Sequence, residues 1–151
     1  MFALKNAVLA VVAAVSFAGA ANAEKVVLDA RFQDGLLSGR MLIGEEGTMF
    51  ATYGYPGASV TVLGKLTELD MLGLLAVISP KLNAWATIGN RELNPKFSFV
   101  VTNGSQVIKY GTSHPDAQEQ AILDTLAKLF RLVQAGKRPL DPAAGSISLG
   151  A

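Results

Sequence analysis

The chain contains no cysteine, and this absence excludes several kinds of chemistry. Disulfide bonds, cysteine-based zinc sites, thiol catalysis and a lipid anchor on cysteine all need a thiol. A charge excess is also lacking, because 13 Lys and Arg residues stand against 12 Asp and Glu residues, for a net charge of +1. That balance offers no electrostatic footprint for nucleic acid. Half of the 151 residues are apolar, which is too many for a disordered chain and suits a single globular domain.

The longest apolar run lies at the N-terminus and has the pattern of an export signal. Lys5 precedes an uncharged stretch over 7–21 that is rich in Ala, Val and Leu, and a small-residue site ends at Ala23. This pattern is typical of a secretory signal peptide. A membrane-spanning helix needs roughly 20 apolar residues, and this run is shorter. We therefore expect cleavage after Ala23 and a periplasmic or secreted protein without a stable membrane anchor.

Short extended segments separated by turn signals occupy the first half of the mature chain. Alternating or β-favouring residues predict strands at 26–32, 41–43, 48–53 and 59–63. Turn signals separate them at Asp34-Gly35, at 44–47 and at 54–57. Further along, an alternating segment at 97–102 precedes Asn103-Gly104, which predicts a hairpin returning at 106–110.

A helix is expected to follow the fourth strand. Thr67 is a candidate N-cap, and Asp70 stands three residues later, where a capping box places its acidic side chain. Proline disfavours helical geometry in the residue before it, so Pro80 predicts that this helix ends at Ser79. The segment 82–88, which contains the only tryptophan, is left open between a strand and a loop.

A second helix is expected after the hairpin. Ser113 and Asp116 form another candidate capping pair, and Gly136 is a natural stop. Between them an apolar stripe recurs at helical spacing at Ile122, Leu126, Leu129, Phe130 and Val133. The segment 137–151 has little bulk and is expected to be a mobile tail. Together these elements predict one α+β domain over 24–136, an antiparallel sheet with two helices packed on one face.

Candidate chemical groups are few. His114 is the only histidine, and no second chemical group is placed beside it by the sequence. Glu45 and Glu46 are the only adjacent acidic pair, and they lack the spaced oxygen ligands of a calcium loop. No nucleophile or phosphate-binding motif occurs. We expect neither an enzyme, nor a metal site, nor a cofactor.

The strongest candidates for contact with a partner are aromatic. Tyr53, Tyr55 and Pro56 lie in a stretch whose glycines and proline favour a fixed loop shape, and tyrosine is enriched at interfaces. Packing of both rings on the sheet is the alternative. Trp85 is a further candidate, with a place in the core as its alternative.

The order of elements in the second half carries a resemblance. An apolar helix opens at 64–69, a hairpin opens at 95–104, and a helix over 115–130 closes the pattern. This layout, over about Arg31 to Val133, resembles small bacterial α+β domains of unknown function and emfourin-like inhibitors of thermolysin-type metalloproteases. The resemblance implies a non-enzymatic module that binds a protease, and it assigns no functional residue.

Three functions are therefore considered. The first is an exported, non-enzymatic module that binds a protein partner, with protease inhibition as one form. The second is a periplasmic carrier of small apolar ligands, in which the apolar helix over Met71–Ile78 would line a cavity beside the sheet. The third is a hydrolase that uses His114.

Overall fold

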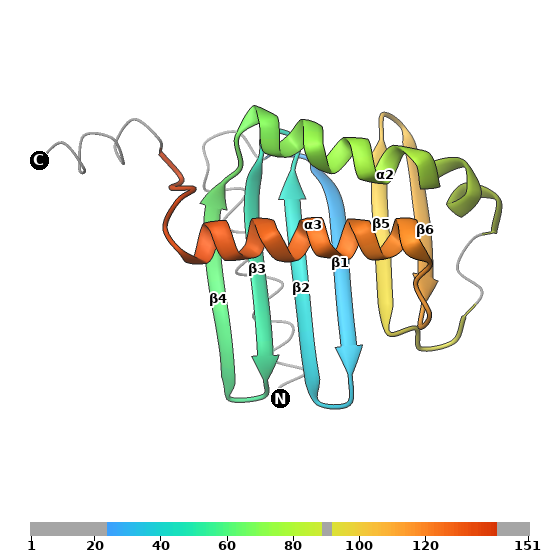
Figure 1. Ribbon diagram of the computed structural model, residues 1–151, viewed down its shortest axis with the longest axis horizontal. Coiled ribbons are helices and arrows are strands. Elements are labelled where there is room, and N and C mark those ends of the chain that lie inside the picture. The colour runs from blue at the N-terminus through green and yellow to red at the C-terminus, as the bar shows by residue number, and fades with distance from the viewer. Residues whose placement is uncertain (1–23, 89–91, 142–151) are drawn as a thin grey trace, which may run out of the picture.

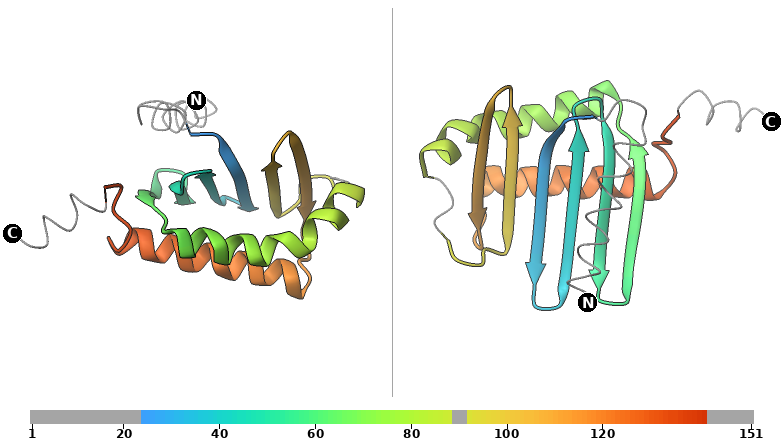
Figure 2. Two further views of the ribbon diagram at one scale, coloured as in Figure 1. Left: turned by 90° about the horizontal axis from the view of Figure 1, so that it is seen from above. Right: turned by 180° about the vertical axis from the view of Figure 1, so that it is seen from behind.

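The computed structural model describes residues 24–88 and 92–141. The expected signal segment 1–23 and the last part of the expected tail, 142–151, lie outside the described residues. Six strands form one antiparallel sheet: β1 (Val26–Asp34), β2 (Leu37–Gly44), β3 (Thr48–Tyr55), β4 (Ala58–Lys65), β5 (Phe97–Asn103) and β6 (Gln106–Thr112). Two helices complete the fold, α2 (Glu68–Ile88) and α3 (Ala117–Gln134), and both lie on the same side of the sheet (Figure 1, Figure 2). The predicted α+β class is confirmed.

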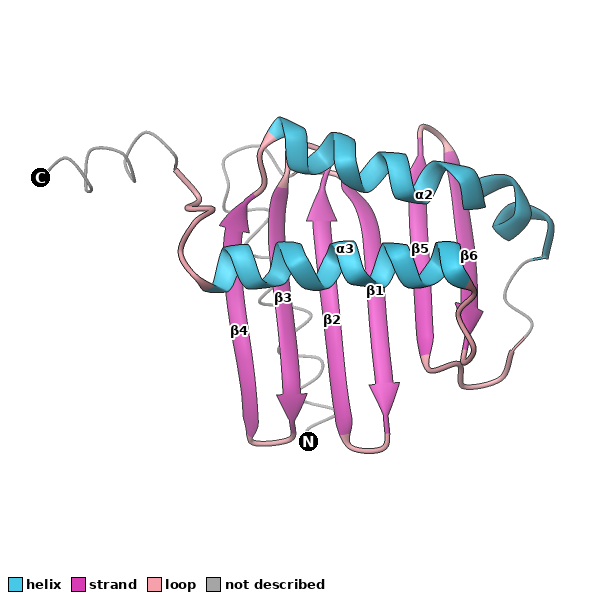
Figure 3. Ribbon diagram, in the orientation of Figure 1, coloured by secondary structure: helices cyan, strands magenta, loops and turns pink. Residues whose placement is uncertain are grey.

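The strand order is β4-β3-β2-β1-β5-β6. The first four strands form a meander, because successive hairpins place each strand beside the one before it. From the end of β4, α2 carries the chain across the sheet, so that β5 pairs with β1 and β6 forms the opposite edge (Figure 3). The core therefore lies between one face of the sheet and the two helices. Its largest fully buried side chains are Trp85, Phe99, Ile43, Met49 and Ile122.

The strands extend further than the sequence predicts. β3 continues through Tyr55, so the stretch that was expected to be a loop is mostly strand, and only Pro56 and Gly57 form the turn. Gly57 has a φ of +80°, a conformation that glycine adopts without strain. The β5–β6 hairpin turns at Gly104 and Ser105, one residue later than expected, because Asn103 still pairs with Gln106.

Pro80 does not end the first helix. The prediction of a stop at Ser79 is wrong, and the segment 82–88 is helical. Pro80 is exposed, so the helical hydrogen bond that it cannot donate leaves a carbonyl accessible to water. Beyond it, Lys81 and Trp85 are buried. Their tertiary contacts hold the second half of α2 in place.

The capping motifs show both a confirmed and a corrected prediction. At the start of α2 the amide of Thr67 donates to Asp70 Oδ2 at 2.9 Å and the amide of Asp70 donates to Thr67 Oγ1 at 3.1 Å, which is the predicted capping box. α3 instead begins after Asp116, which forms its capping box with Glu119, and Ser113 is not the cap. Gly136, with a φ of +75°, follows the end of α3 as predicted.

Candidate binding site

The helices leave part of the sheet uncovered on their own side. α2 and α3 cross the sheet side by side, and the ends of the β1–β2 and β3–β4 hairpins project beyond α3 (Figure 1). One row of cross-strand partners runs over this projecting part: Phe97, Phe32, Gly39, Tyr53 and Val60, on β5, β1, β2, β3 and β4. Since alternate residues of a strand share a face, this row lies on the same face as the buried Ala30 and Ala51.

The aromatic rings of this row form a continuous surface with one ring of α3. The ring centroids of Phe32 and Phe97 are 5.2 Å apart, and those of Phe32 and Tyr53 are 6.2 Å apart. Tyr53 meets Phe130 edge-on at 6.4 Å. Gly39 lies between Phe32 and Tyr53 in the row, so no side chain separates the two rings.

A cavity of about 420 Å³ opens between these rings and α3. We call it the aromatic groove, and its lining residues are Ala30, Arg31, Phe32, Gly39, Arg40, Met41, Ala51, Thr52, Tyr53, Phe97, Phe99, Leu123, Leu126, Ala127, Phe130 and Arg131. Three small residues, Ala30, Gly39 and Ala51, lie on neighbouring central strands and lower the floor of the groove. Leu123, Ala127 and Phe130 form its helical wall. The surface within the groove is almost entirely apolar.

The only charged side chains among these lining residues belong to arginines. Two of them, Arg31 and Arg40, are cross-strand partners whose side chains lie on the other face of the sheet, where they bind Asp29 through N–O distances of 3.2 Å and 3.0 Å. Burial raises the pKa of the Asp29 carboxyl, but hydrogen bonds from Arg40 and Arg31 outweigh burial and hold that pKa below its ordinary value. Within the described part of the chain, no ion pair and no side-chain hydrogen bond involves Arg131.

The structure separates the residues that the sequence singled out for partner contact. Tyr53 lines the aromatic groove and is 45% exposed. Tyr55 and Pro56 lie at the exposed end of the β3–β4 hairpin and do not line the groove. Trp85 is only 1% exposed. It is therefore a core residue, and its ring is not accessible to the partner that it was expected to contact.

The Trp85 ring lies flat over two neighbouring aromatic side chains of the sheet. It stacks on Phe99 and on Tyr110, with centroid distances of 5.0 Å in both cases, and these two residues are cross-strand partners. Its indole nitrogen donates to Glu119 Oε2 at 3.1 Å. Burial raises the pKa of the Tyr110 phenol. These contacts give Trp85 a structural role between α2, α3 and the β5–β6 hairpin.

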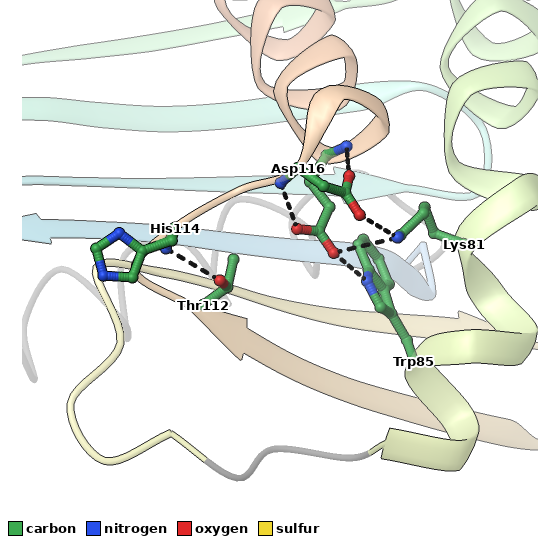
Figure 4. A network of polar contacts seen from close by, with 6 residues as sticks. Lys81, Trp85, Thr112, His114 and Asp116 are labelled. Atoms are coloured by element: carbon green, nitrogen blue, oxygen red, sulfur yellow. Dashed lines mark hydrogen bonds and ion pairs between the residues drawn. The ribbon is translucent and has the colours of Figure 1, made fainter.

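A cluster of ion pairs, in which Lys81 and Glu119 are buried and Asp116 is half exposed, joins the two helices beside this ring (Figure 4). Lys81 Nζ of α2 lies 2.6 Å from Asp116 Oδ2 and 3.4 Å from Glu119 Oε2 at the start of α3. The hydrogen bond with Asp116 raises the pKa of Lys81, and the same bond lowers the pKa of Asp116. No buried side-chain polar atom among the described residues lacks a hydrogen-bond partner, so this network holds the two helices together without leaving a buried charge unpaired.

The remaining chemical candidates do not converge. His114 is exposed, its amide donates to Thr112 Oγ1 at 3.1 Å, and Figure 4 shows its ring pointing away from the Lys81 network. Glu45 and Glu46 lie in an exposed turn. Over residues 24–88 and 92–141, no three acidic or histidine side chains are grouped as metal ligands.

A second apolar surface lies on α2. Leu69, Leu72 and Leu75 are exposed by 79%, 55% and 55% of their surface, and they face away from the sheet and α3. Among the described helices, α2 is the one whose length and composition would also allow it to cross a membrane, a test that core helices of soluble proteins pass as well. The leucines form an unpartnered apolar helix face.

Sequence reasoning found Tyr53 but missed the rest of the groove. The sequence places Phe32 and Phe97 in strands and Phe130 in the apolar stripe of a helix, and no local pattern predicts a site that the three residues share. The alternation of Phe32 with Ala30 and of Phe97 with Phe99 was a usable signal for the sheet face. The pairing of β1 with β5, which brings Phe32 to Phe97, depends on contacts between segments more than 60 residues apart, and no local pattern records it.

The fold and the groove define an α+β protein with an open apolar cavity on one face of its sheet. Comparisons with protein-family models, with curated proteins and with solved structures found no match for this chain. The resemblance to emfourin-like inhibitors therefore stays a prediction.

Proposed function

We propose that this chain is an exported, non-enzymatic binding protein of the periplasm or the extracellular space, and that it holds a small apolar ligand in the aromatic groove. The observation that supports the proposal is the groove itself. Protein interiors are close-packed, and a concave, mostly apolar surface that stays open is the usual form of a small-molecule site. Here small residues on three neighbouring strands and four aromatic rings maintain such a surface.

The size and lining of the groove favour a small molecule. Its volume of about 420 Å³ lies within the range of small-molecule sites, roughly 300–1,000 Å³, which are mostly apolar with few polar groups. The cavity differs in one respect from the carrier expected from the sequence. Its helical wall comes from α3, and Met71–Ile78 of α2 contribute no lining residue.

The proposal is tested with the neutral apolar probe N-phenylnaphthylamine and protein purified after expression of the full chain. We expect saturable binding with an increase in probe fluorescence. Ala127 lines the groove from an exposed position on α3, so Ala127→Trp fills the cavity without disturbing the core and should weaken binding about tenfold or more. Ala121→Trp, also exposed on α3 but outside the groove, is the matched control. Equal binding by both variants would contradict the proposal.

A protein partner is the second candidate, and the exposed leucines of α2 favour it. Leu69, Leu72 and Leu75 present apolar side chains at helical spacing, and Tyr55 adds an exposed ring on the hairpin end. Such a surface suits a partner that buries it, and protease inhibition is one form of this function.

The partner candidate has its own variants. A partner captured by the unaltered protein should be lost with Leu72→Glu or Tyr55→Ala, at unchanged melting temperature, and kept with Ala127→Trp. The inhibitor form is measured directly as loss of activity of a thermolysin-type metalloprotease on adding the protein. Capture that survives Leu72→Glu and Tyr55→Ala would contradict the proposed surface, and full protease activity would contradict inhibition.

A further inference from the structure

We propose that the natural ligand of the aromatic groove is a carboxylate amphiphile, whose hydrocarbon chain lies on the aromatic rings and whose carboxylate pairs with Arg131. This inference rests on the proposed function, and it adds the chemical class of the ligand and the residue that selects it. An anionic head group would complement the positive charge of Arg131, which lines the groove.

Arg131 is the one lining residue whose charged side chain can face the groove. The lining contains three arginines and no acidic residue. Arg31 and Arg40 alternate along their strands with the groove residues Phe32 and Gly39, so their side chains lie on the opposite face of the sheet, where both bind Asp29. Arg131 has no such partner among the described residues and lines the groove from α3. An anionic group is therefore favoured at Arg131, whereas a cationic ligand would meet repulsion there.

The position of Arg131 suits a head group at the mouth of the groove. Arg131 and Tyr53 both line the groove, and Arg131 follows Phe130, whose ring meets Tyr53 at 6.4 Å, so its backbone lies at the Tyr53 end of the aromatic surface. Arg131 is exposed. A carboxylate bound there keeps contact with water and avoids the cost of burying a charge, while the apolar chain is removed from water along Phe32 and Phe97.

α3 itself provides the comparison residue. Arg131 lies in the last turn of α3, where the negative end of the helix dipole attracts a cation whether or not a ligand binds. Lys128 carries the same charge on the same helix, is exposed, and does not line the groove. Loss of either residue lowers the net charge equally, so a difference between the two variants reports contact with the ligand.

The test is isothermal titration of the unaltered protein, Arg131→Gln and Lys128→Gln with decanoate and with decanol at neutral pH, below the micellar concentration of decanoate and below the solubility limit of decanol. The two probes share a hydrocarbon chain and differ in charge. We expect decanoate to bind about fivefold more tightly than decanol, the size of effect of an exposed ion pair. Arg131→Gln should remove this preference and leave decanol unchanged, whereas Lys128→Gln should keep it. Added salt should weaken decanoate selectively.

Each other outcome overturns a defined part of the argument. Equal binding of decanoate and decanol, weakened for both by Ala127→Trp, would refute the carboxylate class and leave the groove as a binding site. Equal losses in Arg131→Gln and Lys128→Gln would show a general effect of charge and would also refute the inference. Absence of binding by both probes, together with failure of N-phenylnaphthylamine to bind, would refute the proposed function itself.

Discussion

Gly39 of β2 lies directly against the ring of its cross-strand partner Tyr53 on β3. A Cβ atom built on Gly39 would lie 2.9 Å from Cδ1 of Tyr53, closer than the ring can tolerate without moving. Gly39 has no positive φ, so steric contact with Tyr53, and not backbone conformation, disfavours a larger residue there. The aromatic groove therefore depends on glycine at position 39 as well as on the rings that surround it.

The first prediction concerns this contact. Gly39→Ala should destabilise the protein by about 1 kcal/mol, because the added methyl group overpacks the site and displaces the Tyr53 ring. In a Tyr53→Ala background the same change should cost less, with a coupling free energy of about 0.5–1 kcal/mol. Urea unfolding of the four proteins measures the cycle. Additive losses would mean that Gly39 and Tyr53 do not constrain each other.

The second prediction concerns the ion pair between the helices. Lys81→Met leaves the carboxylate of Glu119, which is 3% exposed, without its cation. Loss of one member of a buried pair typically costs about 3–5 kcal/mol, and we expect the free energy of unfolding to fall by about 3 kcal/mol. Lys109→Met, at an exposed position on β6, is the control and should change stability by less than about 0.5 kcal/mol. Similar losses in both variants would show that the pair contributes little.

The third prediction uses Trp85, the only tryptophan in the chain. Because its ring is 1% exposed and stacked on Phe99 and Tyr110, its fluorescence should be emitted at short wavelength and should resist quenching by iodide. Unfolding in urea should shift the emission to longer wavelength and make it quenchable. Strong quenching of the native protein would place the ring at the surface and restore Trp85 as a contact residue.

The fourth prediction concerns acid stability. The hydrogen bond from Arg138 holds the pKa of Asp70 below its ordinary value, against the smaller opposing effect of burial. A depressed pKa in the folded state stabilises the protein above the unfolded pKa of about 3.9, and this stabilisation is lost as the pH falls through the folded value. Stability should therefore decline below about pH 4, with Asp116 contributing in the same direction.

Asp70→Asn isolates this contribution. The variant should lose about 1.5–3 kcal/mol at pH 7, the value of a hydrogen bond to a charged group, and much less at pH 2, where Asp70 is protonated. Asp124→Asn, at an exposed position on α3, is the control and should track the unaltered protein at both pH values. An equal loss for Asp70→Asn at pH 7 and pH 2 would show that the ion pair with Arg138 is not the cause.

The fifth prediction concerns export. Expression of the full chain in a bacterium should yield an exported protein whose intact mass corresponds to a first residue at Glu24. The Glu24 carboxylate accepts hydrogen bonds from the amide of Glu46 at 2.9 Å and from Thr48, so the expected new N-terminus begins with a residue that is held by the fold. Ala23→Gln should block cleavage, and Asn22→Gln should not. Accumulation of the uncut chain without these changes would contradict the signal assignment.

Local chemistry accounts for the predictions that were confirmed. Alternation of apolar residues predicts the strands, and the reciprocal pairing of Thr67 with Asp70 predicts the start of α2, because these signals act over a few residues. Gly136 ends α3 through hydrogen bonds within the same turn, since its amide donates to the Val133 carbonyl at 3.0 Å.

Tertiary contacts decided the cases in which local rules conflict. Ser113 was the predicted cap of α3, but its Oγ accepts from the Lys96 amide at 3.0 Å, whereas Asp116 caps the helix through its local pairing with Glu119 and is also bound by Lys81 from α2. The segment 137–151 was expected to be a mobile tail, but near its start Arg138 is held against the sheet. Its carbonyl accepts a hydrogen bond from the Lys65 amide at 3.0 Å.

The sequence by itself determined the fold class and the position of most elements, because hairpin turns, caps and alternation are interactions between near neighbours. Only the tertiary structure decided that α2 continues past Pro80, since burial of Lys81 and Trp85 outweighs one lost hydrogen bond. The aromatic groove has the same origin. Gly39 and Tyr53 meet across strands and Phe130 approaches from a helix far along the chain, so the site exists only after the sheet and α3 have packed.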